Sequence, residues 1–150
     1  MIVQCSSKPP EPLSWGVEVP FISHLGFELR QWHAGSSEIT YEARAEHLNS
    51  LGVTHGGACM TLLDVCMARA ARGENKDVSI VTVEMKTTFM RPARGKLTGR
   101  GTLLHRTESM AFTEASILDS HGRLCAHATG TFRYVRRVPP HSPQPTKGTP

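Results

Sequence analysis

The pattern of apolar and polar residues divides the chain into strand-like runs on either side of one helix-like run. In residues 37–45, which read SEITYEARA, apolar side chains alternate with polar ones, a pattern typical of a half-buried strand. Residues 21–33 are mixed, and their second half favours an earlier strand. Residues 47–54 contain asparagine, serine and glycine and indicate a loop.

The period changes to that of an α-helix between residues 56 and 72. Apolar residues there cover most of the helix circumference, which predicts a buried helix. One face carries Ala58, Leu62, Val65, Cys66 and Arg69, and Cys59, Leu63, Met67 and Ala70 widen the apolar surface. We expect Thr54 to cap the start of this helix and Gly73 to end it.

Four strand-like runs follow the helix, and short turns separate them. They comprise residues 78–90, 96–105, 110–119 and 123–135. Short connections make successive strands antiparallel neighbours. Because one helix cannot cover both faces of a sheet, the order predicts an α+β fold in which an antiparallel sheet curls around one long central helix. The sheet then keeps an edge that needs cover, which favours dimerisation.

The ends of the chain differ from its centre in composition. We expect residues 1–20, which are rich in proline and serine, to form an irregular lead-in, residues 21–137 to form the domain, and residues 138–150 to form a proline-rich disordered tail. The start does not read as a signal peptide, and no apolar run is long enough to cross a bilayer. We therefore expect no membrane partner.

The four cysteines, Cys5, Cys59, Cys66 and Cys125, form no CxxC pair. Cys59 and Cys66 lie on the predicted helix about 10 Å apart, which is beyond disulfide reach. We therefore expect reduced thiols and a cytoplasmic protein.

The net charge of +4 is modest, and many of the basic residues come late in the chain. No aromatic residues interleave with them and no nucleic-acid motif is present, so a phosphate-bearing small ligand is favoured over nucleic acid.

The segment His55-Gly56-Gly57 and the later Asp64 are the strongest candidates for chemistry. Glycines at the start of a helix allow a ligand to approach the backbone, and the first N–H groups there lack internal partners. Together with the helix dipole, these donors suit an oxygen that becomes negative during a reaction. A carboxylate inside an apolar helix costs stability unless it is paired or used. Asp64 is therefore either catalytic or a structural residue on a solvated stripe or bonded to a strand.

Asn49, His55-Gly56-Gly57 and Asp64 resemble the HGG…D signature of hotdog-fold acyl-CoA thioesterases, in particular the PaaI-like and thioesterase superfamily member 2-like branch. The resemblance extends over about residues 20–135 and includes the runs 82–85, 89–93 and 128–132. It implies the hotdog fold and hydrolysis of an acyl-CoA to a free acid and CoA, without a metal or other cofactor.

The resemblance also implies roles for individual residues. The Gly56 N–H would polarise the thioester carbonyl with help from Asn49 and His55. Asp64 would be the nucleophile or the general base, two routes that the sequence leaves open, and Thr82 would orient it. The residues expected to bind the substrate or its CoA part are Gly57, Phe89, Arg91, Arg94, Arg106, Ser109, Met110 and Arg133.

Gly56 and Asp64 cannot serve one carbonyl from the same helix. They are about 12 Å apart along the helix axis, whereas an attacking group must lie about 3 Å from the carbonyl carbon. Two antiparallel helices across a two-fold axis remove this difficulty, because each Gly56 then meets the other chain's Asp64. We therefore expect a homodimer with shared active sites, which two dimers could extend to a homotetramer.

Two other functions remain open. A hotdog hydratase or dehydratase would use His55 with a carboxylate, and a non-catalytic acyl-CoA sensor would bind without turnover. The GxSxG motif of serine hydrolases is missing, and the histidines form no zinc motif with cysteine or carboxylate. The acyl group, whether aromatic, medium-chain or long-chain, is not indicated.

Overall fold

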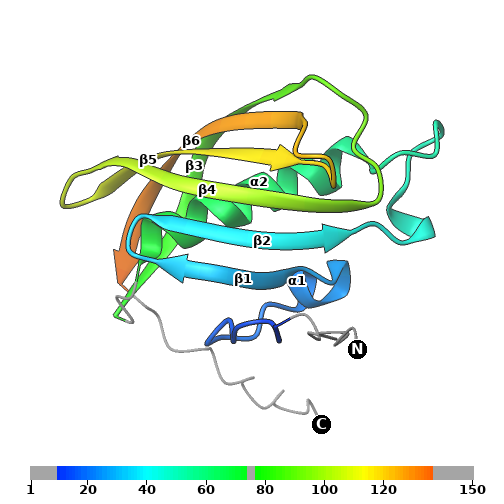
Figure 1. Cartoon of the computed structure of the whole chain (residues 1–150). Coiled ribbons are helices and arrows are strands. Elements are labelled where there is room, and N and C mark those ends of the chain that lie inside the picture. Colours follow the sequence, from blue (N-terminus) through cyan, green and yellow to red (C-terminus); the bar gives the residue numbers. More distant parts are fainter. Residues whose placement is uncertain (1–9, 74–76, 137–150) are drawn as a thin grey trace, which may run out of the picture.

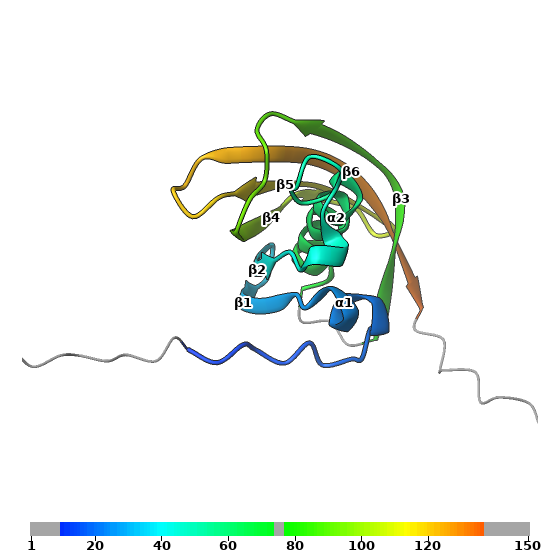
Figure 2. The ribbon, with the colours of Figure 1, turned by 90° about the vertical axis from the view of Figure 1, so that its right-hand side faces the viewer.

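The computed structural model describes residues 10–73 and 77–136, and these form one antiparallel sheet curled around one long helix. The elements in order are α1 (Pro20–Leu25), β1 (Glu28–His33), β2 (Ser36–Glu42), a 3-10 turn (Ala45–His47), α2 (Gly56–Arg72), β3 (Val78–Phe89), β4 (Lys96–Arg106), β5 (Met110–Leu118) and β6 (Leu124–Arg136). The strand order is β1-β2-β4-β5-β6-β3, and every pair is antiparallel. Figure 1 and Figure 2 show α2 lying in the hollow of the sheet. The predicted fold class is confirmed.

The predicted helix and strands agree with the observed ones to within three residues, and Gly73, with φ of 54°, follows the last residue of α2. Two features differ. The cap of α2 is His55 and not Thr54, because His55 directly precedes the first helical residue, Gly56, and its side chain accepts a hydrogen bond from the Gly57 N–H. The short helix α1 was not predicted, since six residues are too few to display a helical period. The predicted tail, residues 138–150, lies outside the described residues.

Two glycines of β4 allow α2 to lie close against the sheet. A Cβ on Gly101 would overlap the carbonyl group of Cys66, and a Cβ on Gly99 would lie 2.6 Å from Cys66 Sγ. The Ser37 hydroxyl donates a 2.8 Å hydrogen bond to the same Cys66 carbonyl. These contacts fix the height of α2 above the sheet two residues after Asp64, and so position that carboxylate.

The side of α2 that faces away from the core is partly covered. Met60 is exposed, and Thr61, Asp64, Val65 and Ala68 are half-buried. Strand β3 forms one edge of the sheet (Figure 2), and among the described residues it pairs only with β6. This free edge and the Asp64 side of α2 meet where Thr82 of β3 bonds to Asp64.

Candidate active site

The start of α2 leaves one backbone donor without a partner. The Gly57 N–H donates to His55 Nδ1 at 2.9 Å, and the Ala58 and Cys59 N–H groups donate to the His55 carbonyl at 2.9 and 3.1 Å. The Gly56 N–H has no acceptor among the residues that the structure describes. It is therefore the donor at the positive end of the helix that a ligand oxygen can use.

The His55 side chain is engaged in the cap. Because Nδ1 accepts the Gly57 N–H, Nε2 is the ring nitrogen that can donate a hydrogen bond in this arrangement. The His55 N–H donates to the His47 carbonyl at 2.9 Å and fixes the backbone that precedes the helix. His55 thus positions the Gly56 N–H, and the Gly57 N–H is not free to bind a substrate.

Asn49 holds the loop in front of α2. Its Oδ1 accepts hydrogen bonds from the Leu51 and Val53 N–H groups at 2.9 and 3.2 Å, which leaves its NH₂ group as the part that can donate to a ligand. Asn49 and Gly56 line one hollow of about 400 Å³ with Phe89. The Phe89 ring packs against Gly56, since a Cβ there would lie 3.4 Å from Phe89 Cζ.

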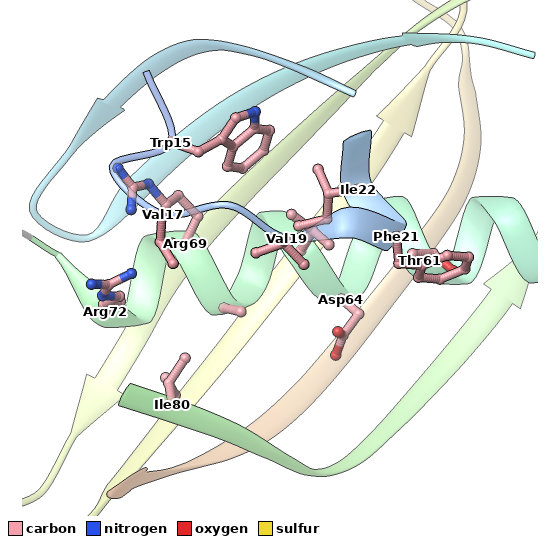
Figure 3. Close-up of a pocket in the computed structure, with 12 residues that line it drawn as sticks. Trp15, Val17, Val19, Phe21, Ile22, Thr61, Asp64, Arg69, Arg72 and Ile80 are labelled. Atoms are coloured by element: carbon pink, nitrogen blue, oxygen red, sulfur yellow. The ribbon is translucent and has the colours of Figure 1, made fainter. Parts of the chain in front are cut away.

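Asp64 lines a different hollow, also of about 400 Å³, between α2, β3 and the segment before α1 (Figure 3). The Thr82 hydroxyl donates a 2.8 Å hydrogen bond to Asp64 Oδ1. Burial raises the pKa of the Asp64 carboxyl above its ordinary value, and the Thr82 hydrogen bond partly opposes this. Among the described residues no cation forms an ion pair with Asp64. A carboxylate in this setting is a stronger base than an exposed one.

Most of the walls around Asp64 are apolar and come from residues that the sequence analysis did not single out. They include Trp15, Val17, Val19, Phe21, Ile22 and Ile80. Residues 15–20 belong to the region predicted to be an irregular lead-in, yet the Leu13 N–H bonds the Leu29 carbonyl at 2.7 Å and holds this segment against the domain. The alternation of Trp15, Val17, Val19 and Phe21 with polar or small neighbours is the signal that predicts such a wall.

The predicted CoA-binding residues form two groups at opposite ends of the sheet. Arg91 and Arg94 line the Gly56 hollow, where they donate to the Leu124 and Gly52 carbonyls at 2.8 and 3.3 Å. The second group lies where β4 turns into β5, at the other end in Figure 1. Its members are Arg106, which stacks on Tyr134, Ser109, whose carbonyl accepts the Tyr134 N–H, and Met110, which pairs with Arg133.

The distance between these groups follows from the register of β3 with β6. Val81 lies opposite Arg133, whereas Phe89 lies opposite Ala126. Eight residues of strand correspond to about 26 Å. One chain therefore does not bring all the predicted binding residues together, just as it holds Gly56 and Asp64 in separate hollows.

Comparison with known proteins identifies the family. The family model described as "Thioesterase superfamily" matches residues 51–126, which include both Gly56 and Asp64. The chain belongs to the thioesterase superfamily. A Saccharolobus solfataricus relative, SSO2140, which carries a provisional esterase name, is 32% identical over 100 residues, or 66% of this chain and 70% of its own.

Solved structures agree with this membership of the thioesterase superfamily. A phenylacetic acid degradation-related protein of Ralstonia eutropha JMP134 is 31% identical, with a TM-score of 0.72 over 78% of this chain and 92% of its own. The Escherichia coli PaaI protein of the phenylacetic acid degradation operon has a TM-score of 0.72 over 77% of this chain and 83% of its own. At 20% identity the PaaI comparison shows the shared hotdog fold alone.

Three other features of the described residues bear on function. Within residues 10–73 and 77–136, no helix is long and apolar enough to cross a membrane, and no three His, Cys, Asp or Glu side chains gather as metal ligands. Cys59, Cys66 and Cys125 are free thiols, and Cys5 lies outside the described part.

Proposed function

We propose that this chain hydrolyses an acyl-CoA thioester to a free carboxylic acid and CoA, with Asp64 as the catalytic carboxylate. Membership of the thioesterase superfamily supports thioester hydrolysis in general. The observation that carries the residue assignment is the state of Asp64: partly buried, bonded to Thr82, with a raised pKa, and with no ion pair to a cation of residues 10–73 or 77–136. Such a carboxylate retains the basicity that hydrolysis near neutral pH requires.

Two routes use the same residues. As a general base, Asp64 takes a proton from water, the hydroxide adds to the carbonyl carbon, the C–S bond breaks, and the proton passes to the leaving sulfur. As a nucleophile, Asp64 attacks the carbonyl carbon itself, CoA leaves as the thiolate, and water cleaves the resulting anhydride. In both routes the Gly56 N–H donates to the carbonyl oxygen as it becomes negative.

The proposed active site is shared between two chains. Gly56 and Asp64 are about 12 Å apart along α2 and line separate hollows. Two α2 helices that lie antiparallel across a two-fold axis place the Gly56 of one chain beside the Asp64 of the other. The free edge of β3 and the Asp64 side of α2 are available for this contact.

The same arrangement accounts for the two basic groups. In one chain, Arg91 and Arg94 lie near Gly56, whereas Arg106 and Arg133 lie at the end of β3 that carries Thr82. An antiparallel dimer brings the first group of one chain towards the second group of the other. Both groups then border one site, where they bind the phosphates of CoA.

A complementation experiment tests the shared site. Asp64→Asn removes the base, and Gly56→Pro removes the N–H donor at a helix position that tolerates proline. Each variant alone is expected to be inactive, and a heterodimer regains one intact site, so activity approaches half of the wild-type value. Gly56→Ala is the matched control, because it adds a Cβ beside Phe89 yet keeps the N–H. No recovery, despite subunit exchange confirmed by mass spectrometry, would rule out the shared site.

Release of free thiol distinguishes hydrolysis from the two alternatives. A hydratase or dehydratase changes the acyl carbons and a sensor only binds, so neither releases CoA. A hydratase role is also disfavoured because His55 Nδ1 accepts a hydrogen bond in the helix cap. Incubation of the purified protein with short, medium, long and aromatic acyl-CoAs is expected to release thiol from at least one of them.

A further inference from the structure

The hollow beside Asp64 is apolar along its walls and cationic at one end. Asp64 projects from α2 on the side of β3, and Arg69 and Arg72 lie farther along the same helix (Figure 3). At 1.5 Å per residue, their Cα atoms are about 7.5 and 12 Å from that of Asp64 along the axis. The proposed reaction uses the Asp64 end and assigns no role to the two guanidinium groups.

Arg69 is an unusual residue for this position. It is only 8% exposed, its guanidinium carbon lies 3.7 Å from the centroid of the Trp32 ring, and its Nε has no hydrogen-bond partner in the part of the chain that the structure describes. Among the described residues neither Arg69 nor Arg72 has a carboxylate within ion-pair distance. Burial, and then the charge of Arg72, lower the pKa of Arg69. A buried cation without an anion is costly, so this end of the hollow is suited to an anionic group.

We infer that the acyl group hydrolysed by this protein carries a carboxylate at the end remote from the thioester, and that Arg69 and Arg72 bind that carboxylate. This inference rests on the proposed function, because it places the thioester at Asp64. Arginine is the residue best suited to bind a carboxylate through paired N–H groups. The stack on Trp32 holds the Arg69 side chain in place and limits the entropy lost on binding.

The geometry also sets the length of the acyl group. An extended carbon chain advances about 1.3 Å per bond, since three backbone bonds span about 3.8 Å. The separations along α2 therefore correspond to about six to nine bonds. The contacts at the two ends of the acyl group, one with Asp64 and one with an arginine, take up about 3 Å each of this distance. Acyl groups with about six carbons fit this distance.

The test compares adipoyl-CoA with hexanoyl-CoA, which have the same number of carbons and differ in the terminal carboxylate. Wild-type kcat/KM is expected to be about 10- to 100-fold higher for adipoyl-CoA, the range for a hydrogen bond to a charged group. Arg72→Gln is expected to lower this ratio about tenfold, and Arg72→Glu to favour hexanoyl-CoA. Arg69→Met, which keeps the apolar stem, is expected to remove the preference.

Arg100→Gln is the matched control for net charge. Arg100 is an exposed arginine of β4 that pairs with Glu38 outside the hollow, so its loss should leave the substrate ratio unchanged. If Arg69→Met does not fold, Arg72→Gln and Arg72→Glu decide the question, because Arg72 is partly exposed at the end of α2. Ratios that do not change in the Arg72 variants would overturn the inference.

A binding measurement separates this inference from the proposed function. Calorimetry on Asp64→Asn gives the Kd of each CoA ester without turnover, and adipoyl-CoA is expected to bind about 10- to 100-fold more tightly. Hydrolysis of hexanoyl-CoA as fast as adipoyl-CoA, with equal Kd values, refutes the carboxylate site and leaves thioester hydrolysis intact. Absence of thiol release with the predicted Kd ratio refutes hydrolysis and supports the carboxylate site.

Discussion

Asp64→Asn is expected to change activity and stability in opposite directions. Asparagine has nearly the same shape, and its Oδ1 can still accept the hydrogen bond that Thr82 donates at 2.8 Å, so α2 and β3 should stay in place. The substitution removes only the charge and the basic oxygen. Loss of a positioned base should lower kcat by at least about 100-fold, or about 2.7 kcal/mol of activation free energy.

The stability effect follows from the pKa of Asp64. Because burial raises this pKa in the folded state, the folded chain binds the proton more tightly than the unfolded chain. The stabilising contribution of protonated Asp64 is complete below the ordinary aspartate value and is lost as the pH rises through the folded-state pKa. At pH 7 the wild-type chain therefore carries the cost of a buried carboxylate. Asparagine carries no such cost. Each tenfold difference between the ionisation constants of Asp64 in the folded and unfolded states corresponds to about 1.4 kcal/mol of stability at pH 7.

The assay combines thiol release from an acyl-CoA with thermal unfolding between pH 3 and 8. The Asn variant is expected to unfold at a higher temperature than wild type at pH 7, and the difference should vanish near pH 3. Asp119→Asn provides the matched control of opposite sign. Hydrogen bonds from the Arg123 N–H and guanidinium and from the His121 N–H lower the pKa of Asp119, so its loss should destabilise the chain at pH 7. Near-normal turnover by Asp64→Asn, or a lower melting temperature at pH 7, would refute this reasoning.

Three further predictions concern other parts of the site and fold. Thr82→Val should lower kcat about tenfold and move the acidic limb of the pH–rate profile to higher pH, because it removes the hydrogen bond that lowers the Asp64 pKa. Thr82→Ser should restore both kcat and the position of this limb. Gly101→Ala should lower the free energy of unfolding, measured by chemical denaturation, by about 1–3 kcal/mol, because the added Cβ overlaps the Cys66 carbonyl. Thr102→Ala, at the exposed neighbouring residue, should change this free energy little. Alanine at the four arginines proposed to bind CoA should raise KM with little change in kcat; these are Arg91, Arg94, Arg106 and Arg133. An unchanged KM would show that these arginines do not bind the substrate.

The sequence predicted those elements whose apolar pattern repeats over many residues, and it missed features that depend on one or two residues. Helix α2 was predicted from residue 56 to residue 72 because its apolar side chains repeat with the helical period over four turns. The strands were located by alternation and by glycine-containing turns. The short helix α1 has no such repeat, and its start and end depend on Pro20 and on the left-handed Gly26. The cap at His55 depends on the backbone angle of one residue, which composition does not determine.

The candidate site shows the same division between local and distant signals. Gly56 and Asp64 stand out in the sequence because a glycine pair opens a helix and a carboxylate interrupts its apolar pattern. The hydrogen bond between Asp64 and Thr82 depends on β3 lying beside α2, and only the family resemblance indicated it. The two basic groups were predicted as residues but not as groups, since their separation of about 26 Å follows from strand register.

Arg69 illustrates why a sequence motif indicates a reaction more readily than a substrate. Its position on the apolar face of α2 was evident from the helical period, but Trp32, which covers it, belongs to β1. The walls of the adjoining hollow come from three segments far apart in the chain: residues 15–22, α2 and the start of β3. The proposed chemistry depends mainly on a short segment with fixed spacing, whereas the fit to an acyl group depends on how distant segments meet. Relatives that keep Gly56 and Asp64 but differ at Trp15, Arg69 or Arg72 would therefore be expected to share the reaction and to differ in the acyl group.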